Sequence, residues 1–377
     1  MAQQYDYIIL GAGAAGLSLA VRLANDPWFA SKRILLIDRE PKTRNDRTWC
    51  VWERGAGYFE ELVHHRWQQL HVRHYEGQLP LQLKGYEYKL IRGIDFYKHA
   101  FATLAQAPHI QVLYDAVQQV EAATGLVHCA NGSYQATHIF SSVLLQEPAM
   151  QPADLYLLQH FRGWWVETDT DCFDPAAADL MNFRTSQQHG CAFVYVLPVS
   201  KRRALIEYTL FTEDTLTDEQ YDEGLRHFMT HEMQLSQYRI TEVENGIIPM
   251  TNLRFPASDG RIVFIGTAGG QTKASTGYTF QYIQKHSQAL LQWLKQPGTP
   301  LPQPAARFRF YDTVLLRVLH ERRLPGADVF FRLFQNNPAD RVFRFLDNES
   351  NFWEELLLMN STPKSIFVPA ALASLRG

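Results

Sequence analysis

The stretch "YDYIILGAGAAG", from Tyr5 to Gly16, decides the fold, because a short β-rich run passes directly into a glycine turn and the start of a helix. Its glycines Gly11, Gly13 and Gly16 follow the G-x-G-x-x-G pattern. In that pattern the first glycine permits the tight turn, and the second lets the backbone approach a pyrophosphate at the helix N-terminus. The third lets the helix pack closely on the strand. The stretch therefore predicts the first half of a nucleotide-binding βαβ unit.

The following strand completes this unit. "RILLIDRE", from Arg33 to Glu40, reads as a buried strand about twenty residues beyond the glycines, and Asp38 at its end can accept a hydrogen bond from a ribose hydroxyl. A lone glycine motif could mark only a glycine- and alanine-rich helix that packs on a strand, but the complete context favours a dinucleotide. The position near the N-terminus favours FAD over a nicotinamide without deciding between them. The cofactor contacts predicted in this part of the chain are Gly11, Gly13, Ala14, Ala15, Gly16, Asp38, Arg39 and Val117.

A second strand, glycine-rich loop and helix are predicted late in the chain, from Gly260 to Leu294, with the strand at residues 261–265. Many flavoproteins close over the flavin with such a unit, although it could equally be an ordinary βα crossover. Gly266, Ser275, Thr276 and Gly277 are the predicted cofactor contacts, with backbone N–H groups of Ser275 to Gly277 at a helix N-terminus facing the flavin. The alternative is that Ser275 or Thr276 simply caps that helix.

The segments between these units are rich in predicted strands. One hairpin turns at Asn131-Gly132, and "CAFVYVLP" with "RALIEYTLF" forms a second. From Pro297 to Pro304 the chain reads as a linker, and the remainder is helical. We therefore predict an α/β protein in which a Rossmann-type FAD-binding domain carries an inserted β-rich substrate domain and a C-terminal helical segment. The expected bounds are 1–60, 85–145 and 255–300 for the FAD-binding domain, 60–85 and 146–254 for the substrate domain, and 301–377 for the helical segment.

The composition narrows the class of protein. The chain has 377 residues and a formal net charge of −3, so no basic excess points to nucleic acid. The four cysteines form no C-x-x-C pair and no histidine cluster has ligand spacing, which predicts a reducing compartment and no metal site. No basic leader precedes the first strand, and no apolar run reaches the roughly 18 residues of a spanning helix. We expect a cytoplasmic protein that is soluble or lies on a membrane surface.

Five stretches of the chain together carry a resemblance to a known family. They are "GAGAAGLSLA", "NDRTWCVWE" (Asn45–Glu53), "YVLPVSKRRALIEYTLF" (Tyr195–Phe211), "ENGIIPMT" (Glu244–Thr251) and "GTAGGQTKASTGYTF" (Gly266–Phe280). With these stretches the chain resembles the lycopene cyclases of the FAD-dependent carotenoid cyclase family, in their bacterial type. The resemblance implies a flavin monooxygenase-like fold and an enzyme that converts the linear ψ ends of lycopene into β-ionone rings, giving β-carotene via γ-carotene. It also implies reduced FAD as the active form, NAD(P)H as the reductant of the flavin, and no net redox change.

The chain departs from the family pattern in two places. Plant-type members carry two adjacent acids where this chain has Glu207 followed by Tyr208, so we expect one carboxylate here and a final proton transfer handled elsewhere, for example by the flavin. Many flavoproteins have Gly-Asp at the start of the late flavin loop, where this chain has Gly266-Thr267. A ribityl or phosphate contact must then be made by other groups.

Glu207 is the predicted catalytic acid. Ring closure needs an acid that protonates a terminal alkene away from water, followed by a site that tolerates a carbocation. Strand alternation places Leu205, Glu207, Thr209 and Phe211 on one face, and apolar surroundings keep a carboxyl group protonated. The alternative is a buried glutamate paired with Arg202 or Arg203.

Aromatic faces are the predicted stabilisers of the cation. The candidates for the substrate pocket are Trp49, Trp52, Tyr195 and Tyr278, with Trp164 and Trp165 as further rings, although each could simply pack in the core. Arg47 is predicted to contact the cofactor, the alternative being a surface or interdomain ion pair.

A hydrocarbon substrate held in a bilayer implies that the protein meets a membrane surface. The segment from Leu324 to Leu346 has the apolar spacing of amphipathic helices with interleaved arginines, and is either membrane-binding or packed on the main body. Rival functions are a flavin monooxygenase or prenyl reductase acting on an isoprenoid, and a non-catalytic FAD- or carotenoid-binding protein. The sequence leaves open the number of rings formed, the β or ε ring type, the preference among lycopene, neurosporene and γ-carotene, and the oligomeric state.

Overall fold

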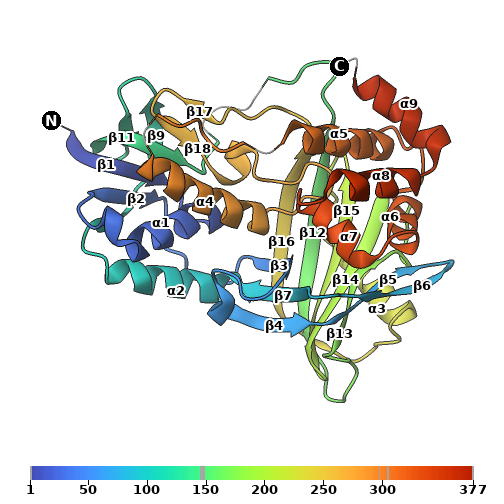
Figure 1. Cartoon of the computed structure of the whole chain (residues 1–377). Helices are drawn as coiled ribbons and strands as arrows, with labels where there is room; N and C mark the ends of the chain where they lie inside the picture. Colours follow the sequence, from blue (N-terminus) through green and yellow to red (C-terminus); the bar gives the residue numbers. More distant parts are fainter. Residues whose placement is uncertain (1, 145–148, 297, 304, 376–377) are drawn as a thin grey trace.

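Two large β-sheets, joined by a small one, organise the chain in the computed structural model (Figure 1). The structure describes residues 2–144, 149–296, 298–303 and 305–375. The ends of the predicted linker, Pro297 and Pro304, lie outside the described residues, as do the ends of several predicted domain ranges. The mixed α/β class predicted from the sequence is confirmed.

The first large sheet carries the glycine turn. Its five central strands run parallel in the order β18-β11-β1-β2-β8, so the predicted βαβ unit lies at its centre. Three helices lie together on one face of this sheet, at the left of Figure 1, and the hairpins of β9 and β10 extend it. The strands are β1 (Gln3–Leu10), β2 (Ile34–Asp38), β8 (Ile110–Tyr114), β9 (Val117–Glu121), β10 (Leu126–Cys129), β11 (Ser133–Ser141), β17 (Ser258–Asp259) and β18 (Ile262–Phe264). The helices are α1 (Ala14–Asn25), α2 (Gly93–Ala105) and α4 (Phe280–Lys295).

The second large sheet carries Glu207. Its strand order is β16-β12-β15-β14-β13-β5-β6, and the predicted hairpin of β14 and β15 forms as expected. One face packs on α3 (Asp218–His231) and the other faces the C-terminal helices. The strands are β5 (Gln69–His74), β6 (Gly77–Gln82), β12 (Tyr156–Glu167), β13 (Ala177–Asn182), β14 (Cys191–Ser200), β15 (Arg203–Thr212) and β16 (Arg239–Thr251).

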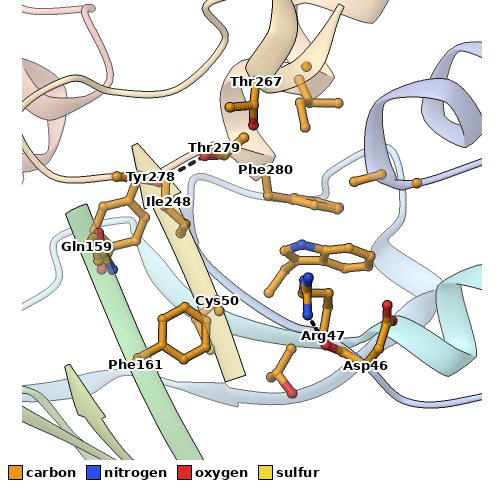
Figure 2. A pocket seen from close by; sticks show the side chains of 18 of the residues that line it. Asp46, Arg47, Cys50, Gln159, Phe161, Ile248, Thr267, Tyr278, Thr279 and Phe280 are labelled. Carbon is orange, nitrogen blue, oxygen red and sulfur yellow. Dashed lines mark hydrogen bonds between the residues drawn. The ribbon is translucent and has the colours of Figure 1, made fainter. Parts of the chain in front are cut away.

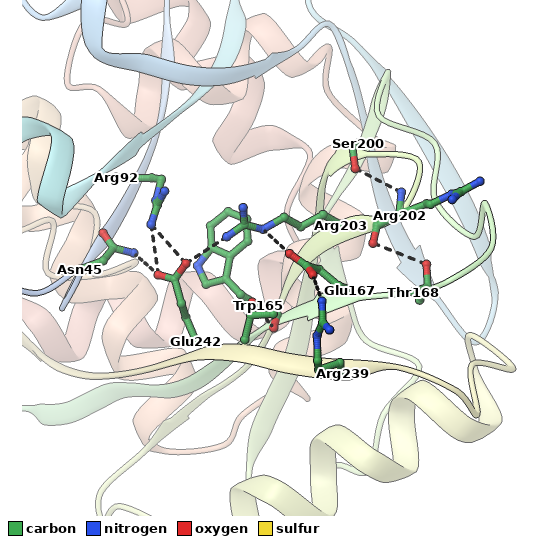
Figure 3. Close-up of polar contacts among 11 residues, drawn as sticks. Asn45, Arg92, Trp165, Glu167, Thr168, Ser200, Arg202, Arg203, Arg239 and Glu242 are labelled. Carbon is green, nitrogen blue, oxygen red and sulfur yellow. Dashed lines mark hydrogen bonds and ion pairs between the residues drawn. The ribbon is translucent and has the colours of Figure 1, made fainter.

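A three-stranded sheet of β3 (Thr48–Glu53), β7 (Glu87–Arg92) and β4 (Val63–Trp67) lies between the two large sheets. Polar contacts fasten it to the second sheet. Glu242 on β16 accepts hydrogen bonds from Asn45 Nδ2 at 3.1 Å, Arg92 Nη2 at 3.2 Å and Arg203 Nη2 at 3.0 Å (Figure 3). The hydrogen bond from Asn45 to Glu242 thereby holds the start of the Asn45–Glu53 segment against β16. Short 3₁₀ helices occur at Pro27–Phe29, Glu60–Leu62 and Gly266–Gly269.

The C-terminal helices cover the face of the second sheet that bears Glu207. They are α5 (Ala306–His320), α6 (Gly326–Gln335), α7 (Ala339–Leu346), α8 (Phe352–Asn360) and α9 (Lys364–Ser374). The apolar stripes of α6 and α7 are buried in the core of this layer, with Phe330 at 3%, Phe331 at 2% and Phe343 at 0% exposure. The membrane-binding reading of Leu324 to Leu346 is therefore wrong, because the sheet and its neighbours already cover these apolar faces. Within the part of the chain that the structure describes, no helix is long and apolar enough to cross a membrane.

Candidate active site

The glycine turn has the geometry that its sequence predicts. Gly11 adopts a φ of +94°, and a Cβ atom on Gly16 would lie 1.9 Å from the carbonyl oxygen of Gly11, so only glycine fits there. A Cβ on Gly13 would meet no described atom within 4 Å. Gly13 precedes the first turn of α1, where no described side chain caps the free N–H groups. This open helix N-terminus, lined by Gly13, Ala14 and Ala15, can take an anionic pyrophosphate.

Alanine substitution is expected to have different effects at Gly16 and at Gly13. Gly16→Ala is expected to destabilise folding by at least about 3 kcal/mol, because the backbone clash cannot relax without moving the strand. Gly13→Ala is expected to leave the thermal midpoint of the FAD-free protein unchanged and to weaken FAD binding at least tenfold, since its methyl group occupies the approach of the pyrophosphate. Thermal denaturation and fluorescence titration with FAD measure the two effects. Equal FAD affinity of Gly13→Ala and wild type would contradict this placement of the pyrophosphate.

Asp38 lies beside the glycine turn at the end of β2. Its Oδ2 accepts the backbone N–H of Ala12 at 2.6 Å, and its Oδ1 accepts a hydrogen bond from Lys42 Nζ at 3.1 Å. Lys42 also lines the large cavity described below, whereas Arg39 lies on the surface with an 80% exposed side chain. Val117 begins β9, and neither Val117 nor Arg39 is among the described lining residues. The positive charge near the predicted ribose site therefore comes from Lys42, which the sequence reading missed.

The late glycine-rich loop approaches the first one. Gly266 has a φ of +62°, and a Cβ there would lie 2.8 Å from Ala15 Cβ, so the two loops are in contact. The helix begins at Phe280 rather than at Ser275, because Gly277, with a φ of +73°, interrupts the helical backbone. The N–H groups of Thr276 and Gly277 both donate to the carbonyl of Lys273, so these hydrogen bonds stay within the loop, and the predicted flavin contacts of the two residues remain a prediction.

The side chains of the late loop are used in other ways than predicted. Ser275 Oγ donates to Asp312 Oδ1 at 2.7 Å, which fastens the loop to α5 instead of capping the helix. Gly277 lines the large cavity, where a Cβ would lie 1.9 Å from Gln159 Oε1. Thr267, which stands where many flavoproteins have an aspartate, also lines that cavity and extends its hydroxyl group there (Figure 2).

One cavity of about 500 Å³ joins the cofactor half of the site to Glu207. Figure 2 shows part of its wall, including Phe280. The ring of Trp49, which also lines the cavity, stacks on Phe280 with 5.2 Å between ring centroids. Arg47 also lines it, and its guanidinium donates to the backbone carbonyls of Asp46 at 2.6 Å and Asn245 at 3.1 Å. Arg47 therefore bridges the segment before β3 to β16 by backbone hydrogen bonds rather than by the ion pair considered as its alternative.

The residues present fit a flavin dinucleotide. An uncapped helix N-terminus, two touching glycine loops, an acid at the end of β2 and an apolar, aromatic middle chamber lie in one continuous site. Gln159 Oε1 lies in the same cavity, buried and without a hydrogen-bond partner among the described residues, so an amide acceptor is available for a ligand N–H. Gly13, Ala14, Ala15, Lys42, Arg47, Gly266 and Thr267 are the residues that would surround the group.

Glu207 lies at the opposite end of the cavity on β15. Its neighbours Leu205 and Phe211 belong to the core under the C-terminal helices, whereas Ile206 and Tyr208 pack under α3, as strand alternation predicts. Glu207 Oε1 accepts a hydrogen bond from Thr209 Oγ1 at 3.0 Å. Burial among apolar groups, and then the charge of Glu244, raise the pKa of Glu207 well above its usual range.

The arginines next to Glu207 in sequence are engaged elsewhere. Arg202 pairs with Asp171 at 2.7 Å. Arg203 pairs with Glu242 at 3.0 Å and with Glu167 at 3.8 Å (Figure 3). Among the described residues Glu207 has no ion-pair partner, so the alternative of a glutamate neutralised by Arg202 or Arg203 is wrong. The carboxyl group is kept neutral by its surroundings instead.

A second buried carboxyl group, missed by the sequence reading, lies in the same row of the sheet. Tyr195, Glu207, Gly163 and Glu244 are directly opposite one another on the adjacent strands β14, β15, β12 and β16, so they share one face. Gly163 lets the side chains on both sides approach closely, because a Cβ there would lie 3.0 Å from Leu205 Cδ1, 3.2 Å from Glu244 Cγ and 3.5 Å from Glu207 Cβ.

Glu244 itself is 4% exposed and lies behind the cavity wall. Its Oε2 accepts a hydrogen bond from Thr48 Oγ1 at 2.7 Å, and its Oε1 has no partner among the described residues. Burial raises the pKa of Glu244 to about 7, in spite of the Thr48 hydrogen bond and the positive charge of Arg47, which lower it. Two carboxyl groups with different raised pKa values are typical of acid–base sites. Glu244 begins the "ENGIIPMT" stretch that carries part of the family resemblance, and this stretch was the sequence feature that could have pointed to it.

Three tyrosine hydroxyl groups form the wall next to Glu207. Tyr278 lies 3.3 Å from Tyr195 and 3.5 Å from Tyr88 between hydroxyl oxygens, and all three residues line the cavity. Burial raises the pKa of all three hydroxyl groups, so they stay neutral and present polarisable rings. Trp52 lies behind this wall, against Tyr278, at 4.2 Å between ring centroids.

Trp164 and Trp165 lie away from the cavity. Trp164 packs under α3 on the opposite face of the sheet, and Trp165 lies beneath the guanidinium of Arg203 at 4.9 Å. The alternative interpretation, that these two tryptophans pack in the core, is therefore correct.

A family model described as lycopene cyclase protein matches residues 6–371. The chain belongs to the lycopene cyclase family. Two curated relatives in this family are the lycopene beta-cyclase of Pantoea ananas, 27% identical over 96% of both chains, and that of Paracoccus sp. (strain N81106 / MBIC 01143), 22% identical over 95% of this chain and 94% of the other. The family identity predicted from the sequence is confirmed.

Solved structures show how widely the fold of this cyclase-family chain is shared. A geranylgeranyl bacteriochlorophyll reductase-like protein from Thermoplasma acidophilum aligns with a TM-score of 0.59 at 12% identity, covering 100% of this chain and 96% of that one. The flavin-dependent brominase Bmp2 aligns with a TM-score of 0.61 at 11% identity, covering 95% and 98%. The predicted fold of flavin-dependent enzymes is therefore confirmed, and the chemistry of this chain has to be argued from its own site.

Proposed function

We propose that this member of the lycopene cyclase family is a lycopene β-cyclase, which converts ψ ends into β-ionone rings and forms β-carotene via γ-carotene. The observation that carries the proposal is the position of Glu207, a carboxyl group with a strongly raised pKa, in the same cavity as the dinucleotide-type glycine loops. A buried, protonated acid suits an isomerisation that begins with proton transfer to an alkene.

The chain's own groups supply the first steps of this isomerisation. Glu207 donates its proton to the terminal double bond, which leaves a tertiary carbocation, and the neighbouring double bond then closes the ring. The rings of Tyr195 and Tyr278 lie beside Glu207 and stabilise the cation by about 0.5–2 kcal/mol each. A second group of the site then accepts one proton from the ring cation, and that proton returns to the Glu207 carboxylate before the next turnover, so substrate and product have the same composition.

The cofactor of the proposal is FAD, active in its reduced form, with NAD(P)H as the external reductant. Reduced FAD, when bound, supplies a negative charge and a basic ring nitrogen near the developing cation. Gly13, Ala14 and Ala15 would hold the pyrophosphate at the N-terminus of α1, and Asp38, which is hydrogen-bonded to Lys42, would serve the ribose. Trp49 and Phe280 bound the chamber between these residues and Glu207 and exclude water from it.

We further propose that the protein works in the cytoplasm on a membrane surface, where carotenoids reside. The support for this is an exposed apolar face on the last two helices. It includes Phe352 at 62% and Trp353 at 73% exposure on α8, and Leu372 at 55% on α9. Large exposed apolar patches mark interaction sites, and an interface with lipid accounts for bulky rings on the outside of a helix.

Expression in a bacterial host that accumulates lycopene tests the function. We expect the pigment to change to β-carotene on chromatography, and the purified enzyme to form many rings for each NAD(P)H consumed once its flavin is reduced. Consumption of one reductant for each product, with an oxygenated or hydrogenated product, would instead identify a monooxygenase or a prenyl reductase. Unchanged lycopene in the presence of folded, FAD-containing protein would contradict both readings.

A further inference from the structure

Three cavities lie one behind another between Glu207 and the C-terminal helices. The large cavity is separated from a smaller one by Tyr195 and Tyr278, which line both. The smaller cavity is separated from a groove under α9 by Leu333 and Leu346, which again line both. Side chains alone thus form each partition. The remaining walls of the middle cavity are mainly apolar: Trp52, Leu180, Met181, Phe193, Phe211, Thr276, Phe330 and Phe334.

The outer groove is apolar along its length. It encloses about 200 Å³ between α5, α6, α7, α8 and α9. From α9 it is lined by Lys364, Phe367, Val368 and Ala371, which share one face of the helix by their spacing of three and four residues. The opposite walls include Val314, Leu315, Val329, Phe345 and Leu358.

The groove adjoins the exposed apolar face of α8 and α9. Val368 belongs to both, since it lines the groove and is 52% exposed. Leu372, one helical turn beyond Val368, is 55% exposed, and Leu375, directly after the end of α9, is 69% exposed. The α9 helix lies at the outer edge of the C-terminal layer, away from the nucleotide-binding sheet (Figure 1). The groove therefore has an apolar mouth on the surface.

We infer that the three cavities form a passage for the hydrocarbon chain of the polyene, which enters beside α9 and reaches Glu207 past Tyr195 and Tyr278. This inference rests on the proposed function. Ligand pockets for compact molecules measure about 300–1,000 Å³, and the large cavity of about 500 Å³ has to hold a flavin ring as well as one substrate end. The rest of a long linear hydrocarbon needs a further apolar channel. The middle cavity of about 20 Å³ shares wall residues with the large cavity and with the groove, so movement of these side chains would join the three.

The partitions are of a kind that such a chain can open. Leu333 and Leu346 are flexible aliphatic side chains at the ends of α6 and α7, and rotamer changes suffice to move them. Tyr195 and Tyr278 present ring faces on either side of their hydroxyl contact, which suits a flat conjugated chain. The passage would also keep the reacting end dry, because its whole length excludes water.

Filling the mouth of the groove tests the inference. Ala371→Trp places a large ring in the groove from a half-buried surface position, and Ala373→Trp adds the same ring to the same helix off the groove. Each protein is loaded with FAD and mixed with lycopene in phospholipid vesicles. Polyene binding is followed by quenching of tryptophan emission, to which Trp52 in the middle cavity responds, and ring formation is followed after reduction.

We expect Ala371→Trp to lower both polyene binding and the initial rate at least tenfold, with FAD affinity and thermal midpoint unchanged. Ala373→Trp is expected to stay within twofold of wild type in every measurement. Wild-type binding and turnover in Ala371→Trp, or equal losses in both variants, would overturn the passage. A different outcome separates the passage from the proposed function. If wild type binds the polyene but forms no ring, and Ala371→Trp still loses polyene binding, the proposed function is refuted and the passage is supported.

Discussion

Glu207→Gln is expected to lower the rate of lycopene cyclisation by about a thousandfold, because general acid catalysis contributes 10²–10⁴-fold and the amide cannot supply the proton. FAD affinity is expected to stay within twofold of wild type, since Glu207 lies at the end of the cavity opposite the glycine loops. Chromatography of the carotenoid product and fluorescence titration of FAD measure the two quantities on the same preparation.

The stability of the Glu207→Gln protein separates catalysis from folding. The folded-state pKa of Glu207 is raised, so ionisation of this group weakens folding as pH rises above the ordinary value of 4.5. A neutral amide removes that penalty, and the thermal midpoint at pH 8 is expected to be equal to or above that of wild type. Tyr208→Phe, on the same strand but facing α3, is the matched control and is expected to keep its activity. More than a tenth of wild-type activity in Glu207→Gln would refute the acid role.

Local pattern was enough to find Glu207, but not the residues around it. A carboxylate in an apolar alternating run is visible in one strand, and its face follows from the period of two. Glu244 became its neighbour only through the strand order, which places β12 between β15 and β16 and Gly163 between the two carboxyl groups. Pairing of strands far apart in sequence leaves no local signal, so the reading that expected a single carboxylate missed the second one.

The predicted helices also show that local sequence does not reveal what an element packs against. The apolar stripe of α6 and α7 was recognised, but a stripe does not reveal whether a sheet or a lipid covers it, and here the sheet does. The start of α4 was placed too early, because Ser275 and Thr276 have the composition of an N-cap while Gly277 turns the backbone away from a helix. By contrast, the nucleotide-binding unit was predictable in full, since its glycines, strand and acid act through short-range geometry.

Glu244→Gln is expected to change the pH dependence of cyclisation rather than its maximum. Cyclisation needs protonated Glu207, so activity is present below the pKa of Glu207 and is lost as pH rises through it. The negative charge of Glu244 is the second largest cause that raises this pKa, and Glu244 itself ionises at about pH 7. At pH 6 Glu244 is mostly neutral and the variant should keep its rate within about fivefold of wild type. Above pH 7 the variant lacks the neighbouring charge, so its alkaline limb should move about one unit lower.

The pH dependence of the free energy of unfolding is an independent test of the same variant. The pKa of Glu244 rises from 4.5 to about 7 on folding, so the folded chain binds more protons than the unfolded chain in that window. The free energy of unfolding should then fall as pH rises from about 4.5 to 7, on the order of 3 kcal/mol for this group. Glu244→Gln should flatten that fall, whereas Glu167→Gln, which removes a partly exposed carboxylate paired with Arg239, should not. If Glu244→Gln lowered the rate equally at every pH, the tuning role would be refuted, because the charge of Glu244 has no effect at a pH where this group is neutral.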